Sequence, residues 1–244
     1  FFSTPTPPPP ILSGLVGSEM CIRDRLNAMK YPILYSFKRC PYAMRARMAL
    51  QLAGIKCELR EVRLNTKPDH MLEASPKGTD PVLVLGDKVI DESNDIINWV
   101  LNDHKILEVN LSEEQSNLAK DLIELFDEKF KFHLDRYKYA TRYENSNTEL
   151  HQSKCMEMLK NLEKIIPKSN WIFGEDISKL DISILPFIRQ FRIANPEWFD
   201  SQEGIEKLQN VLNNFLESKL FKDIMHVYDV WKIDSEPVFF PITN

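Results

Sequence analysis

The clearest chemistry in this sequence is that of one cysteine placed between two predicted elements. The apolar run 31–37 (YPILYSF) predicts a strand, and residues 42–53, rich in Ala, Leu, Met and Arg, predict a helix. Cys40 lies at their junction, directly before Pro41, and proline is favoured at the first helical position. The start of a helix carries unpaired N–H groups and a partial positive charge, and both favour a thiolate over a thiol.

Basic residues near Cys40 act in the same direction. Lys38 and Arg39 precede it, and Arg45 follows about one helical turn later. Surroundings of this kind lower the pKa of a cysteine from about 8.5 to about 3.5–7.5. We therefore expect Cys40 to be reactive; the alternative is the common buried and inert cysteine.

The other cysteines indicate what chemistry Cys40 has available. Ala43 stands where a Cys-x-x-Cys pair would have its second cysteine, so a mixed disulfide with a small thiol is the natural intermediate. Cys57 and Cys155 lie on a predicted strand and a predicted amphipathic helix, where core packing is the more typical role. The four cysteines, which include Cys21, are few and scattered. This pattern is typical of a reducing compartment, and we expect a cytoplasmic protein.

The elements that must position Cys40 change character near residues 104–111. The first part reads as strand, helix, strand, helix, strand, hairpin strand and helix, which predicts an α/β domain with a mixed sheet. The second part reads as helices, with capping residues at Ser112 and at Ser178 and Asp181. We expect a first domain over 29–104 and an all-helical domain over 112–244, with helices near 112–143, 150–166, 182–191, 205–216 and 221–231.

Residues 1–28 differ from the rest of the chain. They contain a proline-rich tract at 5–10, which favours extended backbone and does not pack a core. The stretch 16–25 (VGSEMCIRDR) resembles translated sequencing-adapter sequence. We interpret 1–28 as an artefactual leader before a native start at Met29; a genuine disordered extension is the alternative.

Several short motifs occur in an order that resembles the glutathione transferase family, especially its cysteine-type, omega-like members. The resemblance covers about Met29 to Trp231. It rests on CPYAMRARMAL at 40–50, Lys67-Pro68, Asp80-Pro81-Val82-Leu83, Asp91-Glu92-Ser93, and the run from Phe173-Gly174 through Ser178 and Asp181 to Pro186.

The resemblance implies a thioredoxin-like first domain that binds glutathione as cosubstrate and a helical second domain that binds the other substrate. It also implies a homodimer and a cis peptide bond before Pro81. The implied site residues are Cys40 as nucleophile, Tyr42 over the bound peptide, Lys67 at the glycyl carboxylate, the Val82 backbone at the cysteinyl amide, and Glu92 and Ser93 at the γ-glutamyl end.

The second-substrate site is expected between the domains, beside the first long helix. An apolar stripe on that helix is more typical of core than of a substrate-site lining. The cations between its members are more typical of a solvated face than of nucleic-acid binding. The stripe is Leu122, Phe126, Phe130, His133 and Tyr137, and the cations are Lys129, Lys131, Arg136, Lys138 and Arg142. One departure from the family pattern is Asp80, where an apolar residue more often precedes the proline.

The function expected from Cys40 is that of a glutathione-dependent thiol transferase or reductase acting on a small electrophilic or disulfide substrate. Two alternatives remain: conjugation of glutathione to electrophiles, and a non-catalytic binding or regulatory module of the same fold. The formal net charge of −5 lacks the positive footprint of a nucleic-acid-binding protein. No apolar run is long enough to span a bilayer, and the histidines and cysteines show no metal-ligand spacing.

Overall fold

The computed structural model describes residues 31–144 and 147–241. The sequence-based interpretation of 1–28 and of the start at Met29 concerns residues outside this part of the chain.

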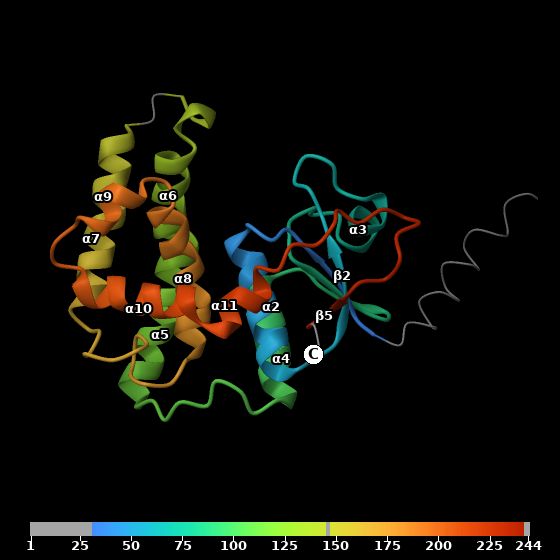
Figure 1. Ribbon diagram of the computed structural model, residues 1–244, viewed down its shortest axis with the longest axis horizontal. Coiled ribbons are helices and arrows are strands. Elements are labelled where there is room, and N and C mark those ends of the chain that lie inside the picture. Colours follow the sequence, from blue (N-terminus) through green and yellow to red (C-terminus); the bar gives the residue numbers. More distant parts are fainter. Residues whose placement is uncertain (1–30, 145–146, 242–244) are drawn as a thin grey trace, which may run out of the picture.

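The first domain is a mixed sheet with helices on both faces (Figure 1). The strand order is β4-β3-β1-β2-β5; β1 and β2 are parallel, and β3 runs antiparallel to β1. The bounds are β1 Ile33–Ser36, β2 Cys57–Glu61, β3 Val82–Leu85, β4 Lys88–Ile90 and β5 Phe239–Phe240, with helices α2 Pro41–Ala53, α3 Asp69–Ala74 and α4 Ser93–Asp103. This is the predicted thioredoxin-like arrangement.

Alternation along the strands explains the two layers of helices. Leu34 and Leu83 belong to the large core that includes residues of α2 and α4. Their neighbours Ile33 and Val82 belong to a smaller core that includes Met71 of α3. Because successive side chains of a strand point to opposite faces, one apolar run supplies both cores.

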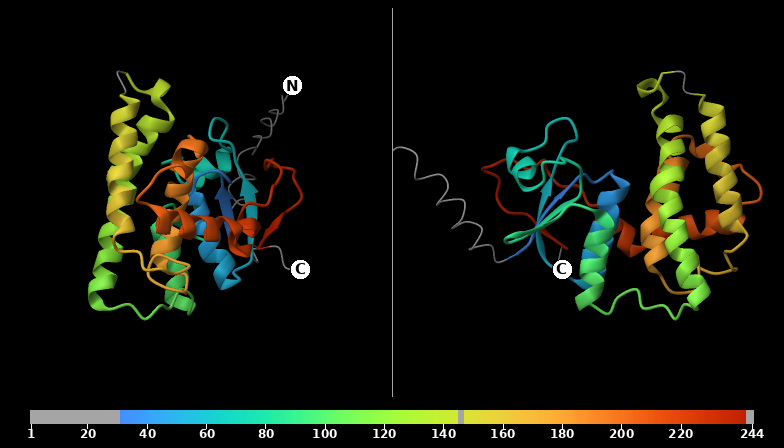
Figure 2. Two further views of the ribbon diagram at one scale, coloured as in Figure 1. Left: turned by 60° about the vertical axis from the view of Figure 1, so that its left-hand side comes forward. Right: turned by 180° about the vertical axis from the view of Figure 1, so that it is seen from behind.

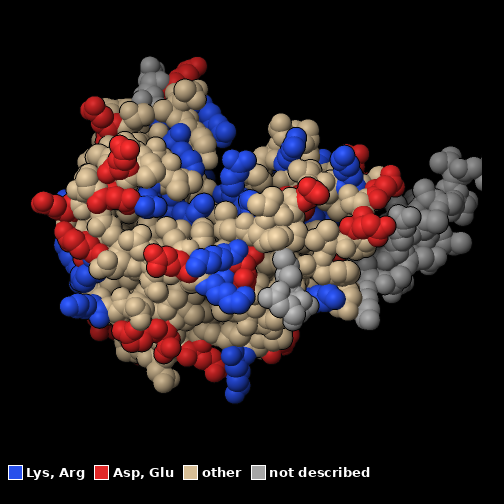
Figure 3. Space-filling view, viewed as in Figure 1, with Lys and Arg blue, Asp and Glu red and all other residues tan. Residues whose placement is uncertain are grey.

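The second domain is helical and stands beside α2 and α4 (Figure 2). Its central helix is α8, whose residues are almost all buried. The bounds are α5 Glu113–Leu125, a π-helical turn η1 Phe126–Phe130, α6 Lys131–Lys138, a 3-10 turn η2 Ala140–Arg142, α7 Thr148–Glu163, α8 Lys179–Arg192, α9 Pro196–Asp200, α10 Glu206–Glu217 and α11 Lys219–Ile224. A notch separates the two lobes on the face shown in Figure 3.

The tail after α11 differs from the prediction. A helix was expected over 221–231, but α11 ends at Ile224 and the chain returns to the first domain. The Trp231 N–H donates to the Glu61 carbonyl at 2.9 Å, and the Trp231 ring packs edge-on against Tyr35. The predicted helical domain at 112–244 included this tail, whereas β5 is the edge strand of the first domain's sheet.

No helix of the described residues is both long and apolar enough to cross a membrane.

The capping motif at the start of α8 is buried, as its predicted structural role requires. The two carboxylate oxygens of Asp181 accept from the Ile172 N–H at 2.9 Å and the Ser178 N–H at 2.8 Å. A similar motif starts α5, where Ser112 and Gln115 cap the helix in an exposed position. The two motifs share the reciprocal capping bonds in opposite surroundings, and Asp181 accepts an additional bond from Ile172.

We predict that Asp181→Ala lowers the free energy of unfolding by about 2–4 kcal/mol, because two buried N–H donors lose their acceptor. Gln115→Ala is the matched control and is expected to cost about 1 kcal/mol or less, because water replaces the lost bond. Urea unfolding curves of both variants measure the difference. Equal losses would contradict the assigned role of burial.

Candidate active site

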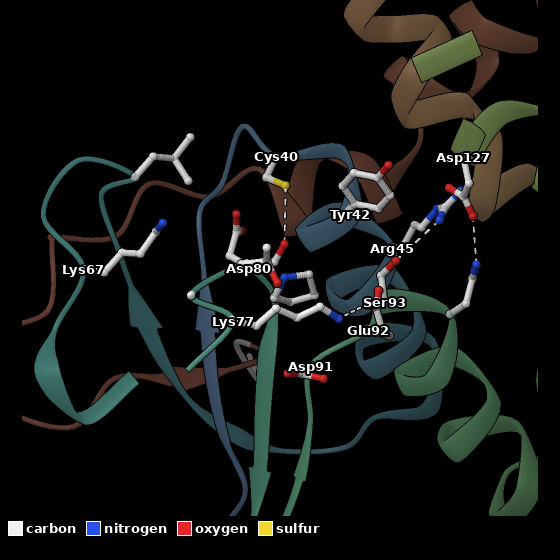
Figure 4. A pocket seen from close by; sticks show the side chains of 15 residues that line it. Cys40, Tyr42, Arg45, Lys67, Lys77, Asp80, Asp91, Glu92, Ser93 and Asp127 are labelled. Atoms are coloured by element: carbon white, nitrogen blue, oxygen red, sulfur yellow. Dashed lines mark hydrogen bonds and ion pairs between the residues drawn. The ribbon is translucent and has the colours of Figure 1, made fainter. Parts of the chain in front are cut away.

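A cavity of about 580 Å³ lies at the start of α2, in the region where the two domains meet (Figure 4). Five of the six predicted site residues line it: Cys40, Tyr42, Lys67, Glu92 and Ser93. The sixth, Val82, does not line it, because its side chain packs into the smaller core next to the lining residue Pro81. The Asp80–Pro81 peptide bond is cis, as predicted.

Cys40 is the N-cap residue of α2 and is half-buried. Its thiol faces the Asp80 carbonyl, with 3.8 Å between Sγ and the oxygen. The backbone N–H groups of Ala43 and Tyr42 at the start of the helix lower the pKa of the thiol, as the sequence predicted. Cys57 and Cys155 are fully buried, in agreement with the core role predicted for both.

The net shift of the Cys40 pKa is nevertheless upward, so the prediction of a lowered pKa is wrong for this structure. Burial is the largest cause, and the Asp80 carboxylate is the second. The cations expected to oppose these effects are placed elsewhere: Arg39 is exposed, and Arg45 is buried against other partners. Neither arginine is among the groups that shift the pKa of Cys40.

Asp80 occupies its position for a structural reason. Its side chain is buried, and Oδ1 accepts the Phe37 N–H at 3.0 Å, which holds the turn between β1 and α2. Burial raises the pKa of this carboxyl group, while the bond from Phe37 lowers it. The loop before β3 therefore holds a carboxyl group whose negative charge raises the pKa of Cys40.

The far wall of the cavity carries paired charges. Glu92 is the N-cap of α4 and forms an ion pair with Lys77. Asp91 accepts a hydrogen bond from the Ser75 hydroxyl at 2.6 Å. Ser93, the first residue of α4, accepts from Arg45 Nη1 at 3.4 Å. The γ-glutamyl end, where the resemblance places Glu92, carries an ammonium group that would suit this carboxylate. In this structure the Glu92 carboxylate is already paired with Lys77.

Arg45 is a site residue whose role the sequence analysis missed. Its side chain is fully buried; Nε donates to the Ser183 carbonyl at 2.7 Å, and Nη2 lies 2.8 Å from Asp127 Oδ1. Asp127 comes from the helical domain and also accepts from Asn94 at 2.9 Å. The signal in the sequence was an arginine inside a run of apolar helix formers, because such a residue must be paired when it is buried.

A second cavity of about 210 Å³ lies on the other side of Cys40, and Cys40, Tyr42 and Leu64 line both cavities. Phe126 and Phe130 of the predicted stripe are fully buried core residues, as expected. The helical wall of this cavity is instead made by Lys131, Leu134 and Asp135 of α6 and by Tyr139, Arg142 and Tyr143 beyond it. Arg142 is exposed, in agreement with the expectation of a solvated face, whereas Lys131 is partly buried; both line this cavity.

Among the described residues, no three His, Cys, Asp or Glu side chains are grouped so that they could hold a metal ion.

The fold and the cavity define a two-domain class of protein in which a thioredoxin-like domain presents one cysteine to a helical domain. Two family models match this chain: "Glutathione S-transferase, N-terminal domain" over residues 34–108 and "Glutathione S-transferase, C-terminal domain" over residues 133–231. Together they cover most of the chain, and it belongs to the glutathione transferase family.

Three similar proteins illustrate the relationship. A probable glutathione S-transferase of Nicotiana plumbaginifolia, MSR-1, is 26% identical over 207 residues, which is 81% of this chain and 92% of that protein. Mouse glutathione S-transferase omega-2 is 42% identical over 50 residues, 20% of each chain. The structure of a glutathione transferase family member from Pseudomonas fluorescens, solved with two glutathione bound, superposes with a TM-score of 0.70 at 17% identity, over 84% of this chain and 97% of that one.

We predict that Asp80→Asn lowers the pKa of Cys40, because it removes the negative charge that opposes the thiolate. Below the pKa, the fraction of thiolate, the species that iodoacetamide alkylates, rises about tenfold for each unit by which the pKa falls. The measurement is the pH profile of Cys40 alkylation. Asp91→Asn is the control, because Asp91 lines the same cavity but is not among the groups that shift the Cys40 pKa. An unchanged or higher pKa in Asp80→Asn would contradict the assignment.

Proposed function

We propose that this protein is a glutathione-dependent thiol transferase or reductase with Cys40 as its nucleophile. The observation that carries the proposal is the position of Cys40 between two cavities, with its sulfur at the start of α2. A thiol exchange brings together the sulfur of the attacking thiolate and the two sulfurs of the disulfide. Two cavities that meet at the Cys40 sulfur can hold the two halves of such a disulfide.

The first half-reaction proceeds from the Cys40 thiolate. It attacks the glutathionyl sulfur of a mixed disulfide, so that a bond to Cys40 forms as the substrate disulfide bond breaks. The second sulfur leaves with the electron pair and takes up a proton. In the second half-reaction, the thiolate of another glutathione attacks the adduct, which releases glutathione disulfide and restores Cys40.

Binding must favour the thiolate that the resting structure disfavours. The N–H groups of Tyr42 and Ala43 already face Cys40 and oppose the upward pKa shift. They become more effective when substrate excludes water from the cavity, because hydrogen bonds strengthen in a low dielectric.

Glutathione would occupy the larger cavity. Lys67 suits the glycyl carboxylate, and Ser93 with the free N–H groups that begin α4 suits the γ-glutamyl carboxylate. Tyr42 would pack over the peptide, and the backbone of Val82, directly after Pro81, would pair with the cysteinyl amide. Glu92 would accept the ammonium group after Lys77 is displaced from it. The Pseudomonas fluorescens relative, solved with two glutathione bound, supports this use of the fold.

The omega-like subtype is part of the proposal. Its support is the local similarity to mouse glutathione S-transferase omega-2 and the motif around Cys40. We also propose a cytoplasmic homodimer, with a first domain over 29–104, a helical domain that begins at 112, and the tail after α11 assigned to the first domain's sheet. The three cysteines of the described residues are free thiols, which supports a reducing compartment.

We predict that incubation with glutathione disulfide adds one glutathione to Cys40, and that Cys40→Ser loses thiol transfer entirely while keeping its affinity for glutathione. Peptide mapping by mass spectrometry locates the adduct, because the full chain also contains Cys21. Cys21→Ser is the control variant and is expected to remain active.

A Cys40→Ser variant with full thiol transfer would overturn the assignment. A different result would identify a conjugating enzyme: the wild-type protein transfers no thiol, and Cys40→Ser conjugates glutathione to a chloronitrobenzene acceptor. Failure of the wild-type protein to bind glutathione would indicate a binding or regulatory module.

A further inference from the structure

The smaller cavity beside Cys40 has an unusual balance of charge. The charged groups that line it are Arg39, Lys131, Arg142 and Asp135, three cations against one carboxylate. Lys131 and Asp135 form an ion pair one helical turn apart, so their charges offset each other. Two guanidinium groups remain.

Arg39 and Arg142 are exposed and lie over aromatic rings at the rim. The Arg39 guanidinium is 5.7 Å from the centre of the Phe37 ring, and that of Arg142 is 4.3 Å from the centre of the Tyr139 ring. Within 31–144 and 147–241, neither forms an ion pair with a carboxylate. Stacking keeps these groups at the rim and leaves their N–H donors available for a planar anion.

A further cation stands behind the cavity. Lys138 is half-buried and donates to the side chain of Gln190, which in turn donates to the Arg39 carbonyl at 2.7 Å. Burial, and then the charges of Arg189 and Arg39, lower the pKa of Lys138 to about 8, while Asp135 opposes the shift. Burial is the largest cause of this shift, and the Arg189 and Arg39 charges add to it.

The surface agrees with this distribution. Figure 3 shows Lys and Arg side chains gathered on the walls of the notch between the two lobes. The whole chain has a net charge of −5, so this concentration is local and does not follow from composition. Positive charge at the mouth of a cleft raises the local concentration of anions and their rate of entry.

We propose that the smaller cavity receives a carboxylate-bearing thiol: the part of the acceptor disulfide that leaves when Cys40 takes the glutathionyl group is anionic, and Arg39 and Arg142 bind its carboxylate. This inference rests on the proposed thiol transfer. The apolar walls, formed by Phe37, Leu134 and Tyr143, contact the carbon chain between the carboxylate and the sulfur. The volume of about 210 Å³ suits a small-molecule thiol rather than part of a protein substrate.

The test uses three mixed disulfides of glutathione whose departing halves have the same two-carbon chain and differ in the charge of the terminal group. The partners are 3-mercaptopropionate, 2-mercaptoethanol and cysteamine, which are anionic, neutral and cationic. The full-length protein is assayed for kcat/KM of each disulfide, a quantity that reports the steps up to release of the first thiol. The intrinsic leaving-group reactivities differ, so the readout is the ratio of variant to wild type for each substrate.

For the double variant Arg39→Gln, Arg142→Gln, we expect kcat/KM to fall about tenfold with the anionic disulfide, to change less than about twofold with the neutral one, and to rise with the cationic one. Added salt is expected to reduce wild-type activity on the anionic disulfide selectively. Lys88→Gln is the matched control; Lys88 is exposed on β4, outside both cavities, and its loss is expected to leave all three ratios near one.

The outcomes separate the two proposals. Equal changes for all three substrates, or no change in the double variant, would overturn the anionic acceptor while leaving thiol transfer intact. If the wild-type protein turns over none of the three disulfides, the proposed function itself fails. Selective loss with the anionic substrate supports both.

Discussion

The buried guanidinium of Arg45 is the interaction that joins the two domains beneath the nucleophile. It lies 4.7 Å from the centre of the Phe187 ring and contacts Ser183 of α8, Ser93 of α4 and Asp127 of η1. Removing such a charge from water is costly unless each donor finds a partner, so the three contacting elements must meet at one place. That requirement orients α2, and with it Cys40, relative to the helical domain.

A second buried arginine performs a related task at the opposite side of α2. Arg47 donates to the Ser36 hydroxyl at 2.7 Å and to the Ile224 carbonyl at 3.1 Å, and it forms an ion pair with Glu61. These contacts join the helix to β1, to β2 and to the end of α11. The two arginines, two residues apart on one helix, tie α2 to both domains, and the cavities on either side of Cys40 follow from that placement.

The state of Cys40 results from a competition between local and tertiary effects. The helix start favours the thiolate through its N–H groups, whereas burial and the Asp80 carboxylate favour the thiol. In the resting protein, burial and the Asp80 carboxylate outweigh the helix start, and the thiol is favoured. A nucleophile held as a thiol until its cavity is occupied is less exposed to oxidation than a free thiolate, because the thiolate is the reactive species.

Much of this molecule follows from local sequence patterns. The strand before Cys40, the helix after it and the capping boxes at Ser112 and Ser178 are short-range features. The sequence determined them through propensity and hydrogen bonding. The order of motifs also indicated the family, and five of the six site residues predicted from it line one cavity. The tertiary structure alone decided where the charges and the tail after α11 lie. Arg45 faces the domain interface rather than the thiol, Lys131 and Arg142 line a cavity beside Cys40, and the tail returns to the sheet instead of extending a helix. The physical reason is that burial, ion pairing and strand pairing depend on which distant residues meet, and spacing along the chain does not contain that information.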